Sequence, residues 1–194
     1  MRREQIVDAL LEQIARAGYA GATIQSIAAA AGINAGLIHY HFKDKRGILV
    51  AAVDTLAAYA RARYERRAAA ATTPRERLRA YVDARLAYGD DARADAVAAW
   101  VMIGAEAVRD ADVRAVYAQS VDAELRQVRA LVRARLADAG KRTRGATKLA
   151  AALVAFVEGV FALASAAREH VPKGFAADMA IELVERYVAA EPDA

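Results

Sequence analysis

Apolar side chains recur every three or four residues along most of the chain, which is the spacing of amphipathic helices. The pattern predicts a first helix over Glu4–Ala17 that ends at Gly18, a second helix that starts after Thr23, and a short third helix over Ala35–His41. Thr23 and Asn34 supply side-chain oxygens that cap helix N-termini, and glycine often follows a helix end. Two short helices joined by a tight glycine-containing turn predict a helix-turn-helix, whose second helix enters the major groove of DNA.

The rest of the chain predicts a helical body. Thr73, followed by proline and three residues later by Glu76, forms a capping box at the start of a helix. A fourth helix is expected to start after Asp44 and to run into the arginine-rich stretch 61–67, and further helices are expected over residues 74–89, 94–108, 112–139, 144–170 and 175–190. The pattern therefore predicts an all-α protein of about nine helices. We expect a DNA-binding domain over residues 1–47 and a larger helical domain over residues 48–194.

Composition and charge support this interpretation. Of the 194 residues, 53 are alanine, the strongest helix former, and only 3 are proline. The absence of cysteine excludes disulfides, thiol catalysis and cysteine-bound zinc. The net charge of +4 arises within residues 1–67, which hold ten basic and six acidic side chains, whereas the remainder is neutral. A basic first third indicates a surface that binds a polyanion.

Several other classes of protein are disfavoured. The apolar stretch Leu149–Ala167 has Glu158 at its centre and is rich in alanine, which favours a buried soluble helix over a membrane span. No secretory signal opens the chain, so we expect a cytoplasmic protein with no membrane partner. His39 and His41 point in divergent directions on a helix, which disfavours a metal site. No catalytic motif is present, so we expect no enzyme, metal or cofactor.

The segment Ala22–Leu49 resembles the TetR family of bacterial transcriptional regulators. The matching features are Gly18, Thr23, Ile27-Ala28, Ala31-Gly32-Ile33, Gly36, Tyr40-His41-Phe42, Lys45 and Leu49. The resemblance implies a homodimeric repressor that binds a palindromic double-stranded DNA operator and is released by a small-molecule effector. Two body segments, Ala99-Trp100-Val101 and Phe156-Val157-Glu158-Gly159-Val160-Phe161, resemble the BetI-type branch, whose best-known members regulate betaine synthesis in response to choline.

The resemblance also implies which residues contact DNA. The predicted set is Thr23, Asn34, Ala35, Gly36, Leu37, His39, Tyr40 and Lys45. Thr23, Tyr40 and Lys45 are expected to contact phosphates, which fixes the register on the duplex without reading its sequence. His39 is expected to read a purine edge, and Ala35 and Leu37 are expected to touch thymine methyl groups. The alternatives to these phosphate contacts are that Thr23 only caps a helix, that Tyr40 packs within the protein and that Lys45 is simply solvated.

Two further positions in this set carry separate arguments. Gly36 lacks a side chain, either because the backbone approaches DNA there or because another helix packs closely against it. Asn34 stands where the family usually has serine or threonine, and it caps a helix equally well. The departures at Leu37 and His39 from the common family pattern leave the operator sequence open.

The helical body is expected to bind the effector. The candidate pocket residues are Trp100, Met102, Glu106, Tyr117, Phe156, Glu158 and Phe161. Aromatic residues at helical spacing are core residues by default, but the family hollows its body for a ligand. Glu106 and Glu158 lie in apolar surroundings, so each is expected to be exposed, paired with an arginine, or facing the ligand. The BetI-like resemblance suggests a quaternary ammonium effector bound by aromatic faces, and paired acids would instead leave a pocket for a neutral molecule.

Two alternative functions belong to other classes. A helical adaptor could use its basic N-terminal region to bind a protein or an acidic membrane surface, and a small all-α enzyme is the other alternative. The adaptor gives no reason for Tyr40-His41-Phe42 and Lys45 at these spacings, and the enzyme lacks a convergent catalytic set. Residues 144–170 and 175–190 carry more apolar surface than one subunit hides, and the family pairs these helices in its dimer interface.

Overall fold

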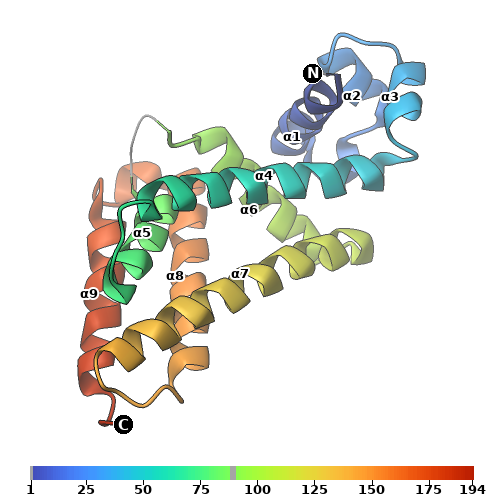
Figure 1. Ribbon diagram of the computed structural model, residues 1–194. Coiled ribbons are helices and arrows are strands. Elements are labelled where there is room, and N and C mark those ends of the chain that lie inside the picture. The colour runs from blue at the N-terminus through green and yellow to red at the C-terminus, as the bar shows by residue number, and fades with distance from the viewer. Residues whose placement is uncertain (1, 88–90) are drawn as a thin grey trace. The chain divides into compact units, whose positions relative to one another are not determined.

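The computed structural model describes residues 2–87 and 91–194, and these residues form nine α-helices, one short 3₁₀-helix and no strand (Figure 1). The all-α prediction is therefore confirmed. The helices are α1 (Arg2–Gly21), α2 (Ile24–Ala30), α3 (Ala35–His41), α4 (Lys45–Ala68), α5 (Pro74–Leu86), α6 (Ala94–Ala107), α7 (Ala111–Asp138), α8 (Ala146–Ala166) and α9 (Phe175–Ala190), with the 3₁₀-helix η1 at Arg168–His170.

The chain folds into two compact units. Unit 1 comprises residues 1–58 and 93–120, and unit 2 comprises residues 59–92 and 121–194. Unit 1 thus contains α1 to α3, the first part of α4, α6 and the start of α7. This division groups α6 with the first three helices, whereas the predicted functional boundary after residue 47 separates them.

Helix ends in unit 1 follow the local signals of the sequence. The Thr23 hydroxyl accepts a hydrogen bond from the backbone N–H of Ser26 at 3.0 Å, and this capping box starts α2. Asn34 Oδ1 accepts from the Leu37 N–H at 2.9 Å and starts α3 at the predicted residue. Gly18 has a positive φ of 71°, as expected at a helix end, but helical residues resume beyond it and α1 extends to Gly21.

The core of unit 1 holds the helix-turn-helix in place. α1 packs against α2 and against α6. The largest fully buried side chains in this unit are Ile6, Leu10, Ile14, Ile27, Ile38, Ile48, Leu49, Ile103 and Val113. The Gln5 amide donates to the Ala31 carbonyl at 2.6 Å, which satisfies an end group of α2 that would otherwise lack a helical partner.

In unit 2, α5 packs against α8 and α9, and α8 packs against α9 (Figure 1). The Thr73 capping box forms as predicted. The Glu76 N–H donates to the Thr73 hydroxyl, and the Thr73 N–H donates to the Glu76 carboxylate. α5 ends at Leu86, and the expected end at Gly89 lies outside the described residues. A two-pronged ion pair from Arg135 to Glu185, 2.6 Å at its shorter contact, ties α7 to α9.

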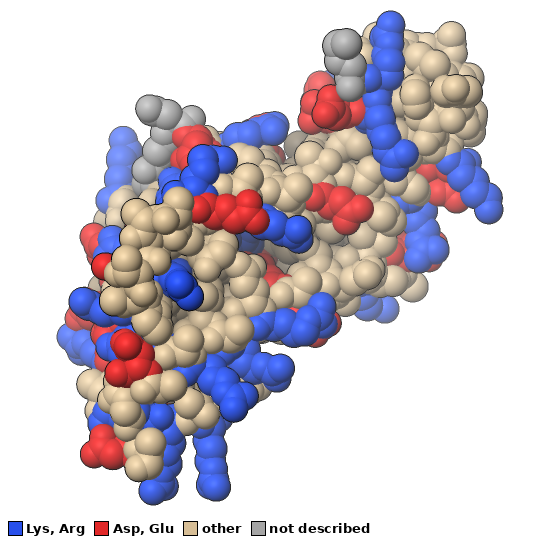
Figure 2. Space-filling view, viewed as in Figure 1, with Lys and Arg blue, Asp and Glu red and all other residues tan. Residues whose placement is uncertain are grey.

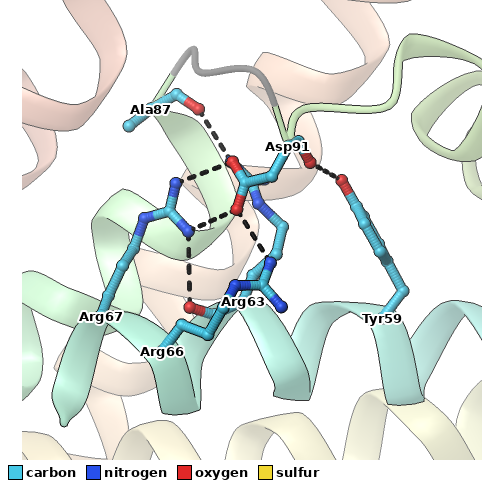
Figure 3. A network of polar contacts seen from close by, with 6 residues as sticks. All are labelled: Tyr59, Arg63, Arg66, Arg67, Ala87 and Asp91. Atoms are coloured by element: carbon cyan, nitrogen blue, oxygen red, sulfur yellow. Dashed lines mark hydrogen bonds and ion pairs between the residues drawn. The ribbon is translucent and has the colours of Figure 1, made fainter.

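A network of arginines ties residue 91 to α4 within unit 2 (Figure 3). The Asp91 carboxylate accepts hydrogen bonds from Arg63 at 3.1 Å, from Arg66 at 3.0 Å and from both terminal nitrogens of Arg67 at 2.9 and 3.0 Å. The Tyr59 hydroxyl donates to the Asp91 carbonyl. These three guanidinium groups hold the pKa of the Asp91 carboxyl far below its ordinary value.

α8 is buried on one side only. By length and composition it is the one helix among the described residues that could cross a membrane, and a third (33%) of its most apolar window is buried. Leu149, Leu153 and Val157 face the neighbouring helices, whereas Ala155 and Gly159 are exposed. The sequence predicts a buried soluble helix, but within one chain α5 and α9 cover only one face of α8.

Candidate nucleic-acid interface

α3 is held by its apolar residues so that its opposite face points outward. Ile38 is fully buried and Phe42 nearly so, as the spacing predicts. The Arg3 guanidinium lies 4.5 Å from the centre of the Phe42 ring, a cation–π contact that links the start of α1 to the end of α3. Because side chains on a helix repeat every 3.6 residues, the residues between these anchors are left free to contact a partner.

The predicted DNA-contacting residues divide into exposed and half-buried groups. The exposed ones are Thr23, Asn34, Gly36, His39 and Tyr40, and the half-buried ones are Ala35, Leu37 and Lys45. The Tyr40 ring is 82% exposed and meets the His41 ring edge-on, with 5.1 Å between ring centres. A large aromatic side chain this exposed has little structural role of its own, which favours a partner contact over the alternative of a packed tyrosine.

The surroundings of Gly36 bear on its two interpretations. A Cβ added at this position would lie 3.3 Å from Asn34 Oδ1, the atom that caps α3, and no neighbouring helix comes within 4 Å of it among the described residues. The close packing of another helix is therefore not the reason for this glycine. Its exposed backbone leaves room for a partner to approach α3 closely.

Lys45 is partly engaged within unit 1. Its ammonium donates to the Tyr19 carbonyl at 2.9 Å and lies 4.1 Å from the centre of the Tyr19 ring. Burial raises the pKa of Tyr19 to about 12, and the charges of Asp110, Asp112 and Asp44 add to this shift. An ammonium has three donors, so Lys45 holds the start of α4 against the end of α1 and keeps further donors beyond the bond to Tyr19.

The two short helices carry no formal charge of their own. α2 and α3 contain no Lys, Arg, Asp or Glu, whereas α1 begins with Arg2 and Arg3, and α3 is followed by Lys43 and by Arg46, which pairs with Asp112. Figure 2 shows an uncharged surface in this part of the protein with basic side chains alongside it. Such an arrangement separates the two tasks of DNA binding, because flanking cations attract phosphates while uncharged side chains read base edges.

Comparison with known proteins shows the family to which this chain belongs. Residues 6–52 match the family described as bacterial regulatory proteins, tetR family, and residues 74–192 match the BetI-type transcriptional repressor, C-terminal. The HTH-type transcriptional regulator BetI of Burkholderia mallei (strain NCTC 10229) is 31% identical over 97% of this chain and 94% of its own length. The chain belongs to the TetR family. It is a TetR-family transcriptional regulator with a BetI-type C-terminal domain, which confirms the resemblance found in the sequence.

Solved TetR-family structures share the fold. A TetR-family transcriptional regulator from Rhodococcus sp. superposes with a TM-score of 0.81 at 24% identity, covering 95% of this chain and 97% of its own. A transcriptional regulator from Saccharomonospora viridis in complex with choline superposes with a TM-score of 0.73 at 24% identity, covering 97% of this chain and 95% of its own. The matched families and the BetI relative are transcriptional regulators, so the prediction of a non-enzymatic function is confirmed.

Four of the seven predicted effector residues lie in unit 1 of the TetR-family fold. Trp100 on α6 is buried and stacks on Tyr117 of α7, with 4.7 Å between ring centres. Met102 is half-buried on α6. The Glu106 carboxylate lies at the kink of α1, since a Cβ added at Gly18 would be 3.1 Å from its Oε1. The structure thus brings the two aromatic residues together and places Glu106 at the contact of α6 with α1.

The other three predicted effector residues lie on α8 in unit 2. Phe156 and Glu158 are half-buried, and Phe161 is buried. The Phe161 ring is covered by the guanidinium of Arg85 on α5, 5.0 Å from the ring centre. Arg85 in turn pairs with Glu124 on α7. Arg85 and Glu124 were not among the predicted residues, although the four-residue spacing of Arg85 from the buried Tyr81 places both on one face of α5.

A cavity of about 470 Å³ in unit 2 lies apart from these candidates. It is lined by Arg67, Ala70, Ala71, Arg75, Glu76, Arg79, Ala80, Asp83 and Ile181. Its charged side chains pair with one another or with nearby acids: Arg79 with Asp83 and Asp178, and Arg75 with Glu185. None of the seven predicted effector residues lines this cavity. Among the described residues, no group of three or more histidine, aspartate or glutamate side chains is placed to hold a metal.

Proposed function

We propose that this TetR-family regulator is a homodimeric repressor that binds an inverted-repeat operator through α3 and leaves it when a small molecule binds the helical body. The observation that carries the proposal is the outward face of α3, where Asn34, Gly36, His39 and Tyr40 are exposed on a helix anchored by Ile38. Repression takes place on the DNA, so we place the protein in the cytoplasm. The DNA-binding part corresponds to residues 1–47 and the sensing part to residues 48–194.

His39 and Lys45 are expected to contribute to DNA binding in different ways. His39→Ala should relax the preference at one base pair in each half-site, at a cost of about 1–3 kcal/mol on the operator, because an imidazole reads a base edge. Lys45→Ala should weaken binding to operator and random DNA about equally and reduce the salt dependence, because an ammonium contacts phosphate. The measurement is a titration of operator and random duplexes at several salt concentrations.

The matched control is His41→Ala, which removes a half-buried imidazole two positions away. It should leave the base preference unchanged, because His41 is half-buried and its ring contacts Tyr40, which is expected to contact a phosphate and not a base. An equal loss on operator and random DNA for His39→Ala would refute a reading role for His39. A helical adaptor would bind both duplexes alike in every variant.

The homodimer is supported by apolar surface on α8 and α9. Three of the large hydrophobic side chains left exposed in the chain are Leu163 on α8 and Met179 and Leu183 on α9. Beside them, Ala155 and Gly159 leave the α8 backbone open to close approach. A two-fold interface of α8 and α9 would cover this surface and present two α3 helices to the half-sites of an inverted repeat.

We propose a quaternary ammonium compound as the effector. The S. viridis regulator of the same fold was crystallised with choline. Phe161 already lies against a cation in unit 2, and the stacked Trp100 and Tyr117 in unit 1 are aromatic faces of the kind that bind ammonium groups. The effector must bind the DNA-incompetent state more tightly, since equal affinity for both states shifts nothing.

The effector class is tested by titrating operator release with choline-like cations and with neutral apolar compounds of similar size. Cations should release the operator at lower concentration than their neutral counterparts, and Glu158→Gln should weaken the response to cations, because it removes a negative charge from α8. Release by the neutral compounds alone, unchanged in Glu158→Gln, would exclude the cationic effector and leave the sensor function standing.

A further inference from the structure

Unit 2 contains a buried positive charge, the guanidinium of Arg85. The Arg85 side chain is 14% exposed and its partner, the Glu124 carboxylate, is 13% exposed. Their closest atoms, Arg85 Nε and Glu124 Oε1, are 3.0 Å apart, and a terminal nitrogen of Arg85 donates to Glu124 Oε2 at 3.3 Å. The same guanidinium covers the face of the buried Phe161 ring. An aromatic face and a carboxylate therefore meet around one positive charge.

One nitrogen of the Arg85 guanidinium lacks a well-aligned hydrogen bond. Arg85 Nε is buried and has no aligned hydrogen-bond partner among the described residues, although Glu124 Oε1 is close. The Glu124 carboxylate is fixed from another side by the Tyr81 hydroxyl, which donates to it at 2.6 Å. The guanidinium is thus held mainly by charge and by the ring face. These are the two interactions that also bind a quaternary ammonium group, which has no hydrogen to donate.

Tyr81 lies next to both charges of this pair. Burial raises the pKa of the Tyr81 hydroxyl well above its usual value, the charge of Glu124 raises it further and the charge of Arg85 lowers it. The elements that build this cluster are α5, α7 and α8, all within unit 2.

We propose that Arg85 is a tethered occupant of a cation-binding site formed by Phe161 and Glu124, and that a quaternary ammonium ligand binds this site in competition with it. The inference rests on the cationic effector of the proposed function and adds the residue that sets its affinity. Arg85 stabilises the empty site, because without it Glu124 would be a buried and unpaired carboxylate. It also weakens cation binding, because the ligand must displace it first.

The test is calorimetric titration of the full-length protein, without DNA, with choline and with the neutral isostere in which carbon replaces the ammonium nitrogen. Arg85→Ala should bind choline at least about tenfold more tightly than the wild type, with no comparable gain for the isostere. Arg85→Met keeps an apolar stem and should show the same selectivity if the alanine variant is poorly folded. Arg85→Lys retains a tethered cation and should show little gain. Arg77→Ala, an exposed arginine of the same helix, is the matched control.

Two further variants report on the site itself. Adding Glu124→Gln to Arg85→Ala should abolish the gain, and Phe161→Leu in the otherwise wild-type chain should lower the affinity for choline. Unchanged choline affinity in both Arg85 variants, an equal gain for the neutral isostere, or unchanged affinity in Phe161→Leu would each overturn the proposal. If choline releases the operator from the wild type while the Arg85 variants bind it no better, this inference fails and the proposed function stands. If no cation releases the operator while Arg85→Ala gains choline affinity, the proposed effector class fails and the site stands.

Discussion

Gly159→Arg should produce a folded monomer that binds an inverted-repeat operator about 10²–10⁴-fold more weakly than the wild type. A Cβ at this position meets no described atom within 4 Å, so unit 2 accepts the longer side chain. The charge would lie on the exposed face of α8, where the proposed dimer brings two copies together. A monomer loses the advantage of binding the second half-site from the same complex, which is the physical reason for the large loss.

The measurement combines sedimentation, which reports the oligomeric state, with operator titration. Val160 and Ala164 are half-buried, so a charge at either position would disturb the fold and the dimer together. Gly159 is exposed, so a charge there tests the dimer without disturbing the fold. Ala130→Arg, on an exposed position of α7, introduces the same side chain outside the proposed interface and should remain a dimer. A dimeric Gly159→Arg protein with normal operator affinity would place the interface elsewhere.

Asp91→Ala should lower the free energy of unfolding by about 3 kcal/mol, because it leaves a buried arginine without its counter-charge. Arg63 is 5% exposed, and without Asp91 its remaining described acceptor is the Ala87 carbonyl, 3.1 Å away. Figure 3 shows that two further arginines converge on the same carboxylate, so their mutual repulsion would also lose its compensation. Urea unfolding at neutral pH measures the change.

The matched control is Arg66→Ala. The Arg66 side chain is 57% exposed, so its removal should cost less than about 1 kcal/mol. Because the pKa of Asp91 is depressed in the folded state, its contribution is present above the ordinary value of 3.8 and is lost only as the pH falls below it. The difference between the wild type and Asp91→Ala should therefore be constant from neutral pH down to about pH 4 and shrink in stronger acid. A difference that disappears between pH 7 and pH 5 would contradict the role of this carboxylate.

The sequence by itself determined the all-α fold, several helix starts and the position of the helix-turn-helix. Asn34, Thr23 and Thr73 cap helices through bonds to backbone groups three residues away, so these starts depend on neighbours in the chain. α3 accordingly begins at the predicted residue, whereas α9, which has no side-chain cap, spans the residues that its hydrophobic spacing predicts. The resemblance around Tyr40 gave the family because its motif lies within one short segment.

The tertiary structure alone decided which charges from distant parts of the chain meet. Asp91 lies more than twenty residues from each of its arginines, and Glu124 lies 39 residues from Arg85, so no local spacing reveals either pairing. The carbonyl partner of Lys45 likewise comes from α1, 26 residues away. Hydrophobic periodicity records which face of a helix is buried, whereas the partner of a buried charge depends on how separate helices pack. For that reason the predicted aromatic residue Phe161 came from the sequence, and the arginine that covers it came only from the fold.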